Sequence, residues 1–240
     1  MQIAELHYAF KLAKDRIDTL ANQDFNVVEI DWLLNEAQLV FIKNRFSEWN
    51  NKRRGFESNT KRVADLSALV VKNPLQPPIV PTLDSNTYEV RLSDLLYPYL
   101  FFVSGTVDIV DANNCTTNVP LKFLQHDDYL YSFRDPFNSP SLEFIPYNFG
   151  LSSTGSGTSL YIYPGDYTIP YVYVEYIKYP SRVCYGNYTY IDGVNYPQST
   201  LELSEHTHQE IVDLACQIAA LNTENPEYIQ LKNQKIMIQE

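Results

Sequence analysis

The sequence is poor in the residues on which many enzyme motifs depend. Only 8 of its 240 residues are glycine, and the patterns GxxxxGK[ST], GxGxxG and GxSxG are absent. Because glycine lets a backbone approach a phosphate closely, this scarcity argues against nucleotide-dependent enzymes. The three cysteines, Cys115, Cys184 and Cys216, lie far apart, which indicates neither a metal-binding pair nor a disulfide framework and favours a reducing cytosol. We expect no enzyme activity, no metal site and no cofactor.

Long hydrophobic segments are also absent. The longest charge-free apolar stretch, 95–107, is interrupted by Pro98 and Gly105 and is shorter than the ~18 to 20 residues that span a bilayer. The first 20 residues carry charged side chains throughout, which excludes the apolar core of a signal peptide. These patterns predict a soluble protein with no membrane partner.

Positive charge is scarce as well. The 18 Lys and Arg residues oppose 29 Asp and Glu residues, so the net charge is -11, and a chain this acidic repels nucleic acid as a whole. Seven of the 18 basic residues nevertheless lie between positions 43 and 62, where only Glu48 and Glu57 oppose them. This stretch is either a solvated loop between helices or a contact surface for DNA or an acidic partner. The candidate contact residues are Lys52, Arg53, Arg54, Lys61 and Arg62.

Helical periodicity is present at both ends of the chain. Apolar residues recur at steps of three and four over 6–20, 30–46 and 57–71, and again over 211–221 and 228–238. Asn26 with Glu29, and Thr207 with Glu210, match the capping box that begins a helix. We therefore predict three helices in the N-terminal part, the third ending before Pro74, and two helices in the C-terminal part.

The middle of the chain has the composition of β-strands. A proline-rich connector, with Pro74, Pro77, Pro78 and Pro81, precedes short runs of Val, Ile, Tyr and Phe that are separated by turn residues. A short helix is predicted at 125–133, and the Ser, Gly and Thr residues of 152–159 predict a flexible loop that nothing pins.

These patterns define an α+β fold. The economical arrangement is one helical bundle, made from the N- and C-terminal helices, with an inserted β-rich domain of the sandwich or barrel type. We place the first part of the bundle at 1–73, the β-rich domain at 82–200 and the second part of the bundle at 201–240.

Tyrosine is the residue in excess, with 19 copies, most of them in the second half of the β-rich domain. Strand alternation over 171–179 puts Tyr171, Tyr173, Ile177 and Tyr179 on one side and Val172, Val174 and Tyr176 on the other. Tyrosine is enriched at protein interfaces, so the first side is either a subunit interface or a platform for carbohydrate. The candidate interface residues are Tyr171, Tyr173 and Tyr179.

Two polar clusters have residue types found in catalytic or metal sites. His206 and Glu210 share one helix face, and His126 precedes Asp127 and Asp128. Both clusters also match the polar first turn of a helix, in which the negative charge is stabilised by the helix dipole. We interpret them as helix starts rather than as metal or acid–base sites.

Several stretches resemble virion proteins of crAss-like tailed bacteriophages. They are YAFKLAKDRID (8–18), EIDWLLNEAQ (29–38), FIK (41–43), FLQHDD (123–128), DPFN (135–138) and EHTHQEIVDLA (205–215). The resemblance implies a structural protein of the head-to-tail connector, also called the neck or adaptor. Such a protein forms a homo-oligomeric ring, expected to be a dodecamer, below the portal.

The same resemblance implies the partners and the location. The ring would extend the channel for double-stranded DNA without sequence-specific binding, contact the portal and other neck or tail proteins, and be assembled in the host cytoplasm. A terminal segment that docks into the portal would fall at 226–240, with Tyr228, Leu231, Ile236 and Ile238 as docking residues. Two alternatives stay open: a tail-associated module that binds glycan through the Tyr-rich strands, and a DNA-packaging factor that uses the basic stretch.

Overall fold

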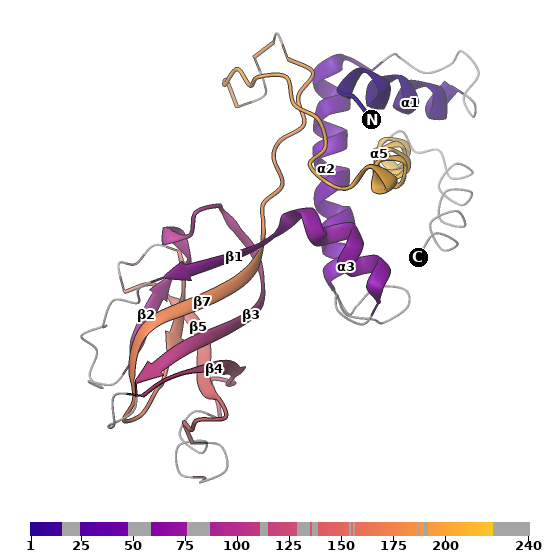
Figure 1. The fold of residues 1–240 in the computed structure, drawn as a ribbon. Coiled ribbons are helices and arrows are strands. Elements are labelled where there is room, and N and C mark those ends of the chain that lie inside the picture. The colour runs from indigo at the N-terminus through magenta and orange to yellow at the C-terminus, as the bar shows by residue number, and fades with distance from the viewer. Residues whose placement is uncertain are drawn as a thin grey trace. The chain divides into compact units, whose positions relative to one another are not determined.

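The computed structural model divides the chain into two compact units. The first unit contains Met1–Leu69 and Pro180–Glu240, and the second contains Val70–Tyr179. The first is helical and the second consists of a sheet (Figure 1), so the protein is α+β. The residues that the structure describes are 1–15, 25–47, 59–75, 87–110, 115–128, 135, 139–153, 155, 157–186, 188–189 and 192–222.

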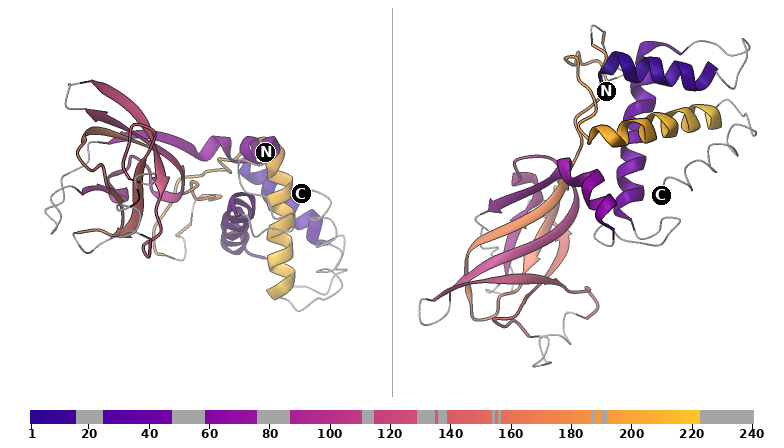
Figure 2. Two further views of the ribbon diagram at one scale, coloured as in Figure 1. Left: turned by 90° about the horizontal axis from the view of Figure 1, so that it is seen from below. Right: turned by 45° about the vertical axis from the view of Figure 1, so that its right-hand side comes forward.

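Four helices form the described part of the first unit: α1 (Ile3–Asp15), α2 (Val27–Phe46), α3 (Thr60–Leu66) and α5 (His208–Asn222). Helices α1 and α5 lie side by side and both contact α2, and α3 contacts α2 as well (Figure 2). Apolar side chains at helical spacing, such as Leu6, Phe10 and Ile211, are buried between them. Among the described residues, no helix is long and apolar enough to cross a bilayer.

One of the two predicted capping boxes forms. The backbone N–H of Asn26 donates to the Glu29 carboxylate at 2.8 Å, which confirms the predicted start of α2. The box predicted for Thr207 and Glu210 is wrong. The Thr207 hydroxyl donates to the Ser204 carbonyl at 2.8 Å within a 3-10 turn, Glu205–Thr207, because Glu210 takes charged partners on α2 and α3 instead.

The third helix is shorter than predicted. It begins at Thr60 and ends at Leu66, continues as the 3-10 turn Ser67–Leu69, and is followed by strand β1 (Val70–Leu75) rather than by more helix. Val70 and Val71 are β-branched, and the residue before Pro74 is biased toward extended backbone, so both features favour the strand. Pro74 is tolerated because β1 is an edge strand.

The seven strands among the described residues belong to one sheet. The other six are β2 (Tyr88–Arg91), β3 (Tyr99–Val110), β4 (Thr116–Phe123), β5 (Ile145–Leu151), β6 (Thr158–Ile162) and β7 (Thr168–Lys178). The order is β1-β7-β3-β4-β5-β6-β2, and every pair is antiparallel except β4 with β5. The short turn Leu92–Asp94 follows β2.

The sheet is strongly curled into a half-barrel (Figure 1). Register shifts in the pairing of β3 with β7 mark irregularities of the bulge type, which bend a strand and increase its twist. The predicted sandwich is therefore wrong, since these strands form one curled sheet rather than two packed sheets, and the barrel-like alternative is the nearer description.

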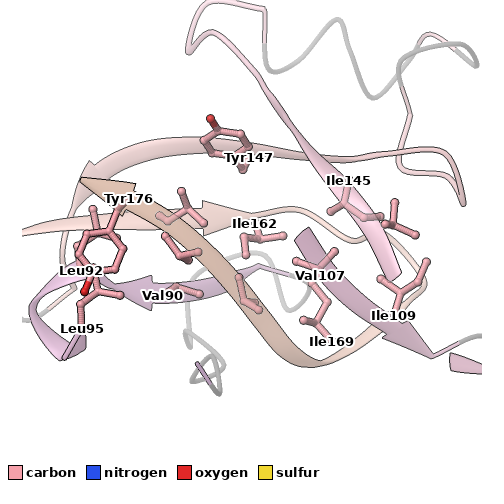
Figure 3. Close-up of a cluster of buried hydrophobic side chains, with 14 residues drawn as sticks. Val90, Leu92, Leu95, Val107, Ile109, Ile145, Tyr147, Ile162, Ile169 and Tyr176 are labelled. Atoms are coloured by element: carbon pink, nitrogen blue, oxygen red, sulfur yellow. The ribbon is translucent and has the colours of Figure 1, made fainter. Parts of the chain in front are cut away.

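The concave face of the sheet holds the hydrophobic core of the second unit (Figure 3). On β7, Val172, Val174 and Tyr176 are fully buried in this core, as the predicted alternation requires, but Ile177, which was predicted on the side of the tyrosines, is fully buried as well. The Tyr176 hydroxyl remains hydrogen-bonded, because it donates to the carbonyl of Tyr97 at 3.2 Å. Tyr171 and Tyr173 consequently face away from the core.

Residues 180–199 leave the sheet and belong to the first unit, whereas the predicted β-rich domain included them. We call this segment the arm; the structure describes it except at 187, 190 and 191. Isolated bridges join Cys184 to Ser199 and Thr189 to Asn195. The arm passes α2 and loops outward beside the N-terminal half of that helix (Figure 1, orange).

Two predicted loop features differ from the structure. Gln125 to Asp128 form a turn, with Asp128 N–H donating to the Gln125 carbonyl at 3.2 Å, and the rest of the predicted helix at 125–133 lies outside the described residues. The expectation that nothing pins 152–159 is wrong. The buried Glu89 carboxylate on β2 accepts hydrogen bonds from the hydroxyls of Ser152, Ser153 and Ser159 at 2.9, 2.6 and 2.7 Å.

Candidate interaction surfaces

The predicted contact residues fall into described and undescribed parts of the chain. Lys52, Arg53 and Arg54 lie outside the described residues, as do the four predicted portal-docking residues Tyr228, Leu231, Ile236 and Ile238. Lys61 and Arg62 on α3, and the three tyrosines of β7 and its end, are described. The predictions for the undescribed residues stay predictions.

Lys61 belongs to a cluster of charges that joins three helices. At its centre, Arg45 of α2 contacts the fully buried Asp65 of α3 at 3.0 Å and also pairs with Glu210 of α5. Lys61 contacts Glu210 at 3.3 Å, and His206 Nε2 lies 2.7 Å from the other oxygen of Asp65. Buried charges need such partners, because desolvation is costly unless attraction and hydrogen bonds offset it.

The cluster limits which basic residues can contact a partner. Arg62 is only 2% exposed, so the chain does not present it at the surface of the first unit. The Lys61 ammonium is partly exposed and its partner Glu210 already lies beside it. Of the described basic residues in this stretch, Arg45 and Lys61 take part in ion pairs between helices and Arg62 is buried, whereas Lys43 is exposed. The role of Lys52, Arg53 and Arg54 in contacting DNA or an acidic partner stays a prediction.

The predicted tyrosine face is exposed. Tyr171 is 45% and Tyr179 48% exposed, and Tyr173, two residues after Tyr171 on the same side of β7, is half-buried. The Tyr173 hydroxyl donates to Asp108 on β3 at 3.1 Å, and this hydrogen bond to a carboxylate, followed by burial, raises the pKa of Tyr173. We use the name Tyr face for these three side chains.

The polar groups around the Tyr face bond to one another across strands. Asp108 also accepts from the Asn118 amide on β4 at 2.8 Å. One row along, Glu175 accepts from the Ser104 hydroxyl at 2.8 Å and pairs with Lys72 at 3.0 Å, and these two contacts lower the pKa of Glu175. Such cross-strand pairs stabilise the sheet and leave the tyrosine rings as the large contact area on this face.

Sequence reasoning missed a second polar site, in which α2 holds the arm. Asn35 makes two hydrogen bonds to Val183: its amide N–H donates to the Val183 carbonyl at 2.8 Å, and its oxygen accepts from the Val183 N–H at 2.9 Å. One turn earlier, the fully buried Asp31 accepts from the Tyr185 N–H at 2.7 Å and from the Tyr188 hydroxyl.

His7 of α1 completes this site, since its Nε2 lies 2.7 Å from the other oxygen of Asp31 and its ring contacts the ring of Tyr185. Burial, followed by the hydrogen bond to Asp31, raises the pKa of Tyr188. We call Asp31, Asn35 and His7 the arm latch. One signal for this site was present in the sequence. Asp31 is a charged residue that directly follows Ile30 within the apolar pattern of a predicted helix, and a charge at such a position needs a partner.

The distal part of the arm is braced by its own side chains. The Arg182 guanidinium pairs with Asp192 and lies over the ring of Tyr196, with 4.7 Å between its central carbon and the ring centroid. The Tyr196 hydroxyl and the Val194 N–H both donate to Asp192, at 2.7 and 3.0 Å. The bond from Tyr196 leads the contacts that lower the pKa of Asp192.

The two polar clusters noted in the sequence do not assemble into a metal site in the described part of the chain. No group of three His, Cys, Asp or Glu side chains there is arranged to hold a metal ion. His206 and Glu210 are each engaged with charged partners, and His126 Nδ1 lies 3.5 Å from the Asn148 amide nitrogen. Cys184 and Cys216 are buried free thiols, and Cys115 is an exposed one.

Comparison with protein-family models finds no family that matches this chain, and comparison with curated proteins finds no significant match. The functional argument therefore depends on the residues themselves.

Proposed function

We propose that the protein is a structural component of a tailed-phage virion that forms a homo-oligomeric ring in the neck, between portal and tail. In this proposal the helices of both chain ends form one bundle, the sheet unit is inserted in it, and the ring extends the DNA channel. The starting point is the resemblance of residues 8–18, 29–38 and 205–215 to virion proteins of crAss-like phages, and 205–215 includes the start of α5.

The observation that carries the proposal is the Tyr face. Tyr171 and Tyr179 expose large rings on a sheet surface whose neighbouring polar groups already bond to one another. Aromatic side chains offer much contact area for little rotamer entropy, and protein interfaces are enriched in them and depleted of charge. A second protein chain, supplied by a neighbouring copy in the ring, fits this surface.

The charge of the chain supports the channel role. At a net charge of -11, a ring of copies would present an acidic wall, which repels DNA and does not retain it during passage. Portal contact through 226–240 is the remaining part of the proposal.

The assembly state tests the proposal. We expect purified full-length protein to form rings in negative-stain images, and an antibody against it to label the neck of virions. A protein that stays monomeric at every concentration tested and is missing from virions would contradict the proposal.

The glycan-binding alternative uses the same exposed tyrosines. A direct binding experiment distinguishes it from the ring proposal. A glycan array probed with the full chain and with Tyr171→Ala would give a tyrosine-dependent signal if the face binds carbohydrate. For the ring protein we expect no such signal.

A further inference from the structure

The arm differs from the rest of the surface in its lack of charge. From position 183 to 199 the sequence has one charged residue, Asp192, in a chain with 29 acidic and 18 basic residues. That carboxylate is paired with Arg182, at the base of the arm. The described part of the arm therefore has little net charge, and its tyrosines are Tyr185, Tyr188 and Tyr196.

The described residues of the arm are also held in place by hydrogen bonds within the chain. The arm latch fixes its base through Val183, Tyr185 and Tyr188, and Asp192 gathers three donors in its distal part. A segment whose backbone is already ordered loses little conformational entropy on association, which favours binding.

Side chains on this ordered segment are available for contact. Tyr185 is 38% and Val194 48% exposed, and the neighbouring Asn195 is exposed as well. Aromatic and apolar groups without charge match the composition of the buried centre of a protein interface. The arm has one basic residue, Arg182, and it is paired with Asp192, so nucleic acid is an unsuitable partner, because phosphate contacts need positive charge.

We propose that the arm of one copy binds the Tyr face of the next copy in the ring. The inference rests on the proposed ring and names its two contact surfaces. A ring joins different surfaces of neighbouring copies, so each chain must supply two, and the Tyr face is only one of them. Copies that each carry a net charge of -11 repel one another, and a neutral arm meeting the tyrosine rings is the contact with the lowest electrostatic cost.

Two single substitutions disable one surface each. Val194→Glu places a carboxylate on the arm, and Tyr171→Glu places one on the Tyr face; both positions are exposed, so the monomer should fold normally. We expect each variant to weaken self-association by about 10-fold or more, measured by sedimentation velocity, because an unpaired charge at an interface loses its hydration. Val194→Thr, of similar shape and neutral, and Leu142→Glu, on a loop residue that is 55% exposed, should assemble as the parent does.

Mixing the two disabled variants gives the decisive result. Each keeps one intact surface, so Val194→Glu and Tyr171→Glu together should form a 1:1 complex that grows no further. Self-association of Tyr171→Glu alone would indicate an arm-to-arm contact and overturn the pairing, and a Val194→Glu variant that still forms rings would overturn the role of the arm. Both outcomes are compatible with the proposed ring, whereas a parent protein that never self-associates would contradict the ring proposal and this inference together.

Discussion

At the scale of single residues, Asp31 has the most demanding environment in the helical unit. Its side chain is fully buried, and it accepts from His7, from the Tyr185 N–H and from the Tyr188 hydroxyl. Asp31→Asn keeps the size of the side chain but replaces one acceptor oxygen with an N–H₂ group. That group cannot accept a hydrogen bond from the donors that now surround the carboxylate. We expect the free energy of unfolding to fall by about 2 to 3 kcal/mol, since hydrogen bonds to a charged acceptor are lost.

Urea denaturation followed by circular dichroism measures this loss. The matched control is Asp127→Asn, which makes the same chemical change at an exposed turn position and should stay within about 0.5 kcal/mol of the parent. Equal stabilities for the two variants would show that the arm latch contributes nothing.

The hydrogen bonds of Glu89 predict that the stability of the second unit depends on pH. Burial of Glu89 raises its pKa, but the hydrogen bonds from Ser153, Ser159 and Ser152 together outweigh this and lower the pKa from 4.5 to about 2. A depressed folded-state pKa means that the unfolded chain takes up the proton first as the pH falls. The stabilisation by this carboxylate is therefore complete above pH 4.5 and is lost as the pH falls toward 2.

The corresponding experiment compares the thermal midpoints of the parent and Glu89→Gln between pH 6 and pH 3. We expect the difference between them to shrink as the pH falls, since the unfolded parent takes up a proton at Glu89 in this range and the variant has no carboxyl group there. Faster proteolysis of Glu89→Gln within 152–159 at pH 6 should accompany the difference, because glutamine replaces one of the two acceptor oxygens with an N–H₂ group that faces serine donors. A constant difference across this range would contradict the assignment.

At the scale of elements, the periodicity of apolar residues was sufficient to predict a helix or strand that buries one face of its own. It was insufficient where pairing with a distant strand determines whether a segment is helix or strand. The helical spacing of Leu6 and Phe10 and the alternation of Val172 and Val174 each reflect one buried face, so both were predictable. Val70 also satisfied a helical spacing, but it pairs with Ile177 in the sheet. Such pairing leaves no signal in a window of a few residues.

The candidate surfaces follow the same distinction. The exposure of Tyr171 followed from strand alternation alone, whereas Asp31 takes the backbone of Tyr185, 154 residues away, as its partner. Arg62 was predicted as a contact because its charge lies in a basic run, and burial within the helical unit could not be inferred from charge alone.

The junction of α2, α3 and α5 gives a prediction at this scale. Arg45→Met removes the cation that faces the buried Asp65, and of its two ionic neighbours Arg45 and His206 the carboxylate keeps His206. We expect a loss of about 3 to 5 kcal/mol, because an uncompensated buried charge is strongly destabilising. The double variant Arg45→Met, Asp65→Asn should recover part of this loss, since the buried charge is removed with its partner.

Denaturant unfolding of the two variants and the parent completes the comparison. Lys72→Met is the control, because it removes a cation from a surface pair with Glu175 and should change stability by less than about 1 kcal/mol. A double variant less stable than Arg45→Met alone would show that Asp65 is held by hydrogen bonds other than the one from Arg45.

At the scale of the whole molecule, the net charge and the proposed ring contact together predict how assembly responds to salt. Copies with a net charge of -11 repel one another, and the repulsion is screened over about 10 Å at 0.1 M salt but over only about 3 Å at 1 M. A contact between a neutral arm and tyrosine rings gains nothing from opposite charges, so salt removes only the repulsive contribution.

Raising the ionic strength should therefore strengthen self-association, seen as a shift toward larger species in sedimentation velocity. The Leu142→Glu control adds one negative charge to each copy outside the arm and the Tyr face, and should show a slightly steeper dependence. Rings that dissociate as salt rises would mean that oppositely charged groups hold the copies together, and would direct attention from the arm to the basic stretch at 43–62.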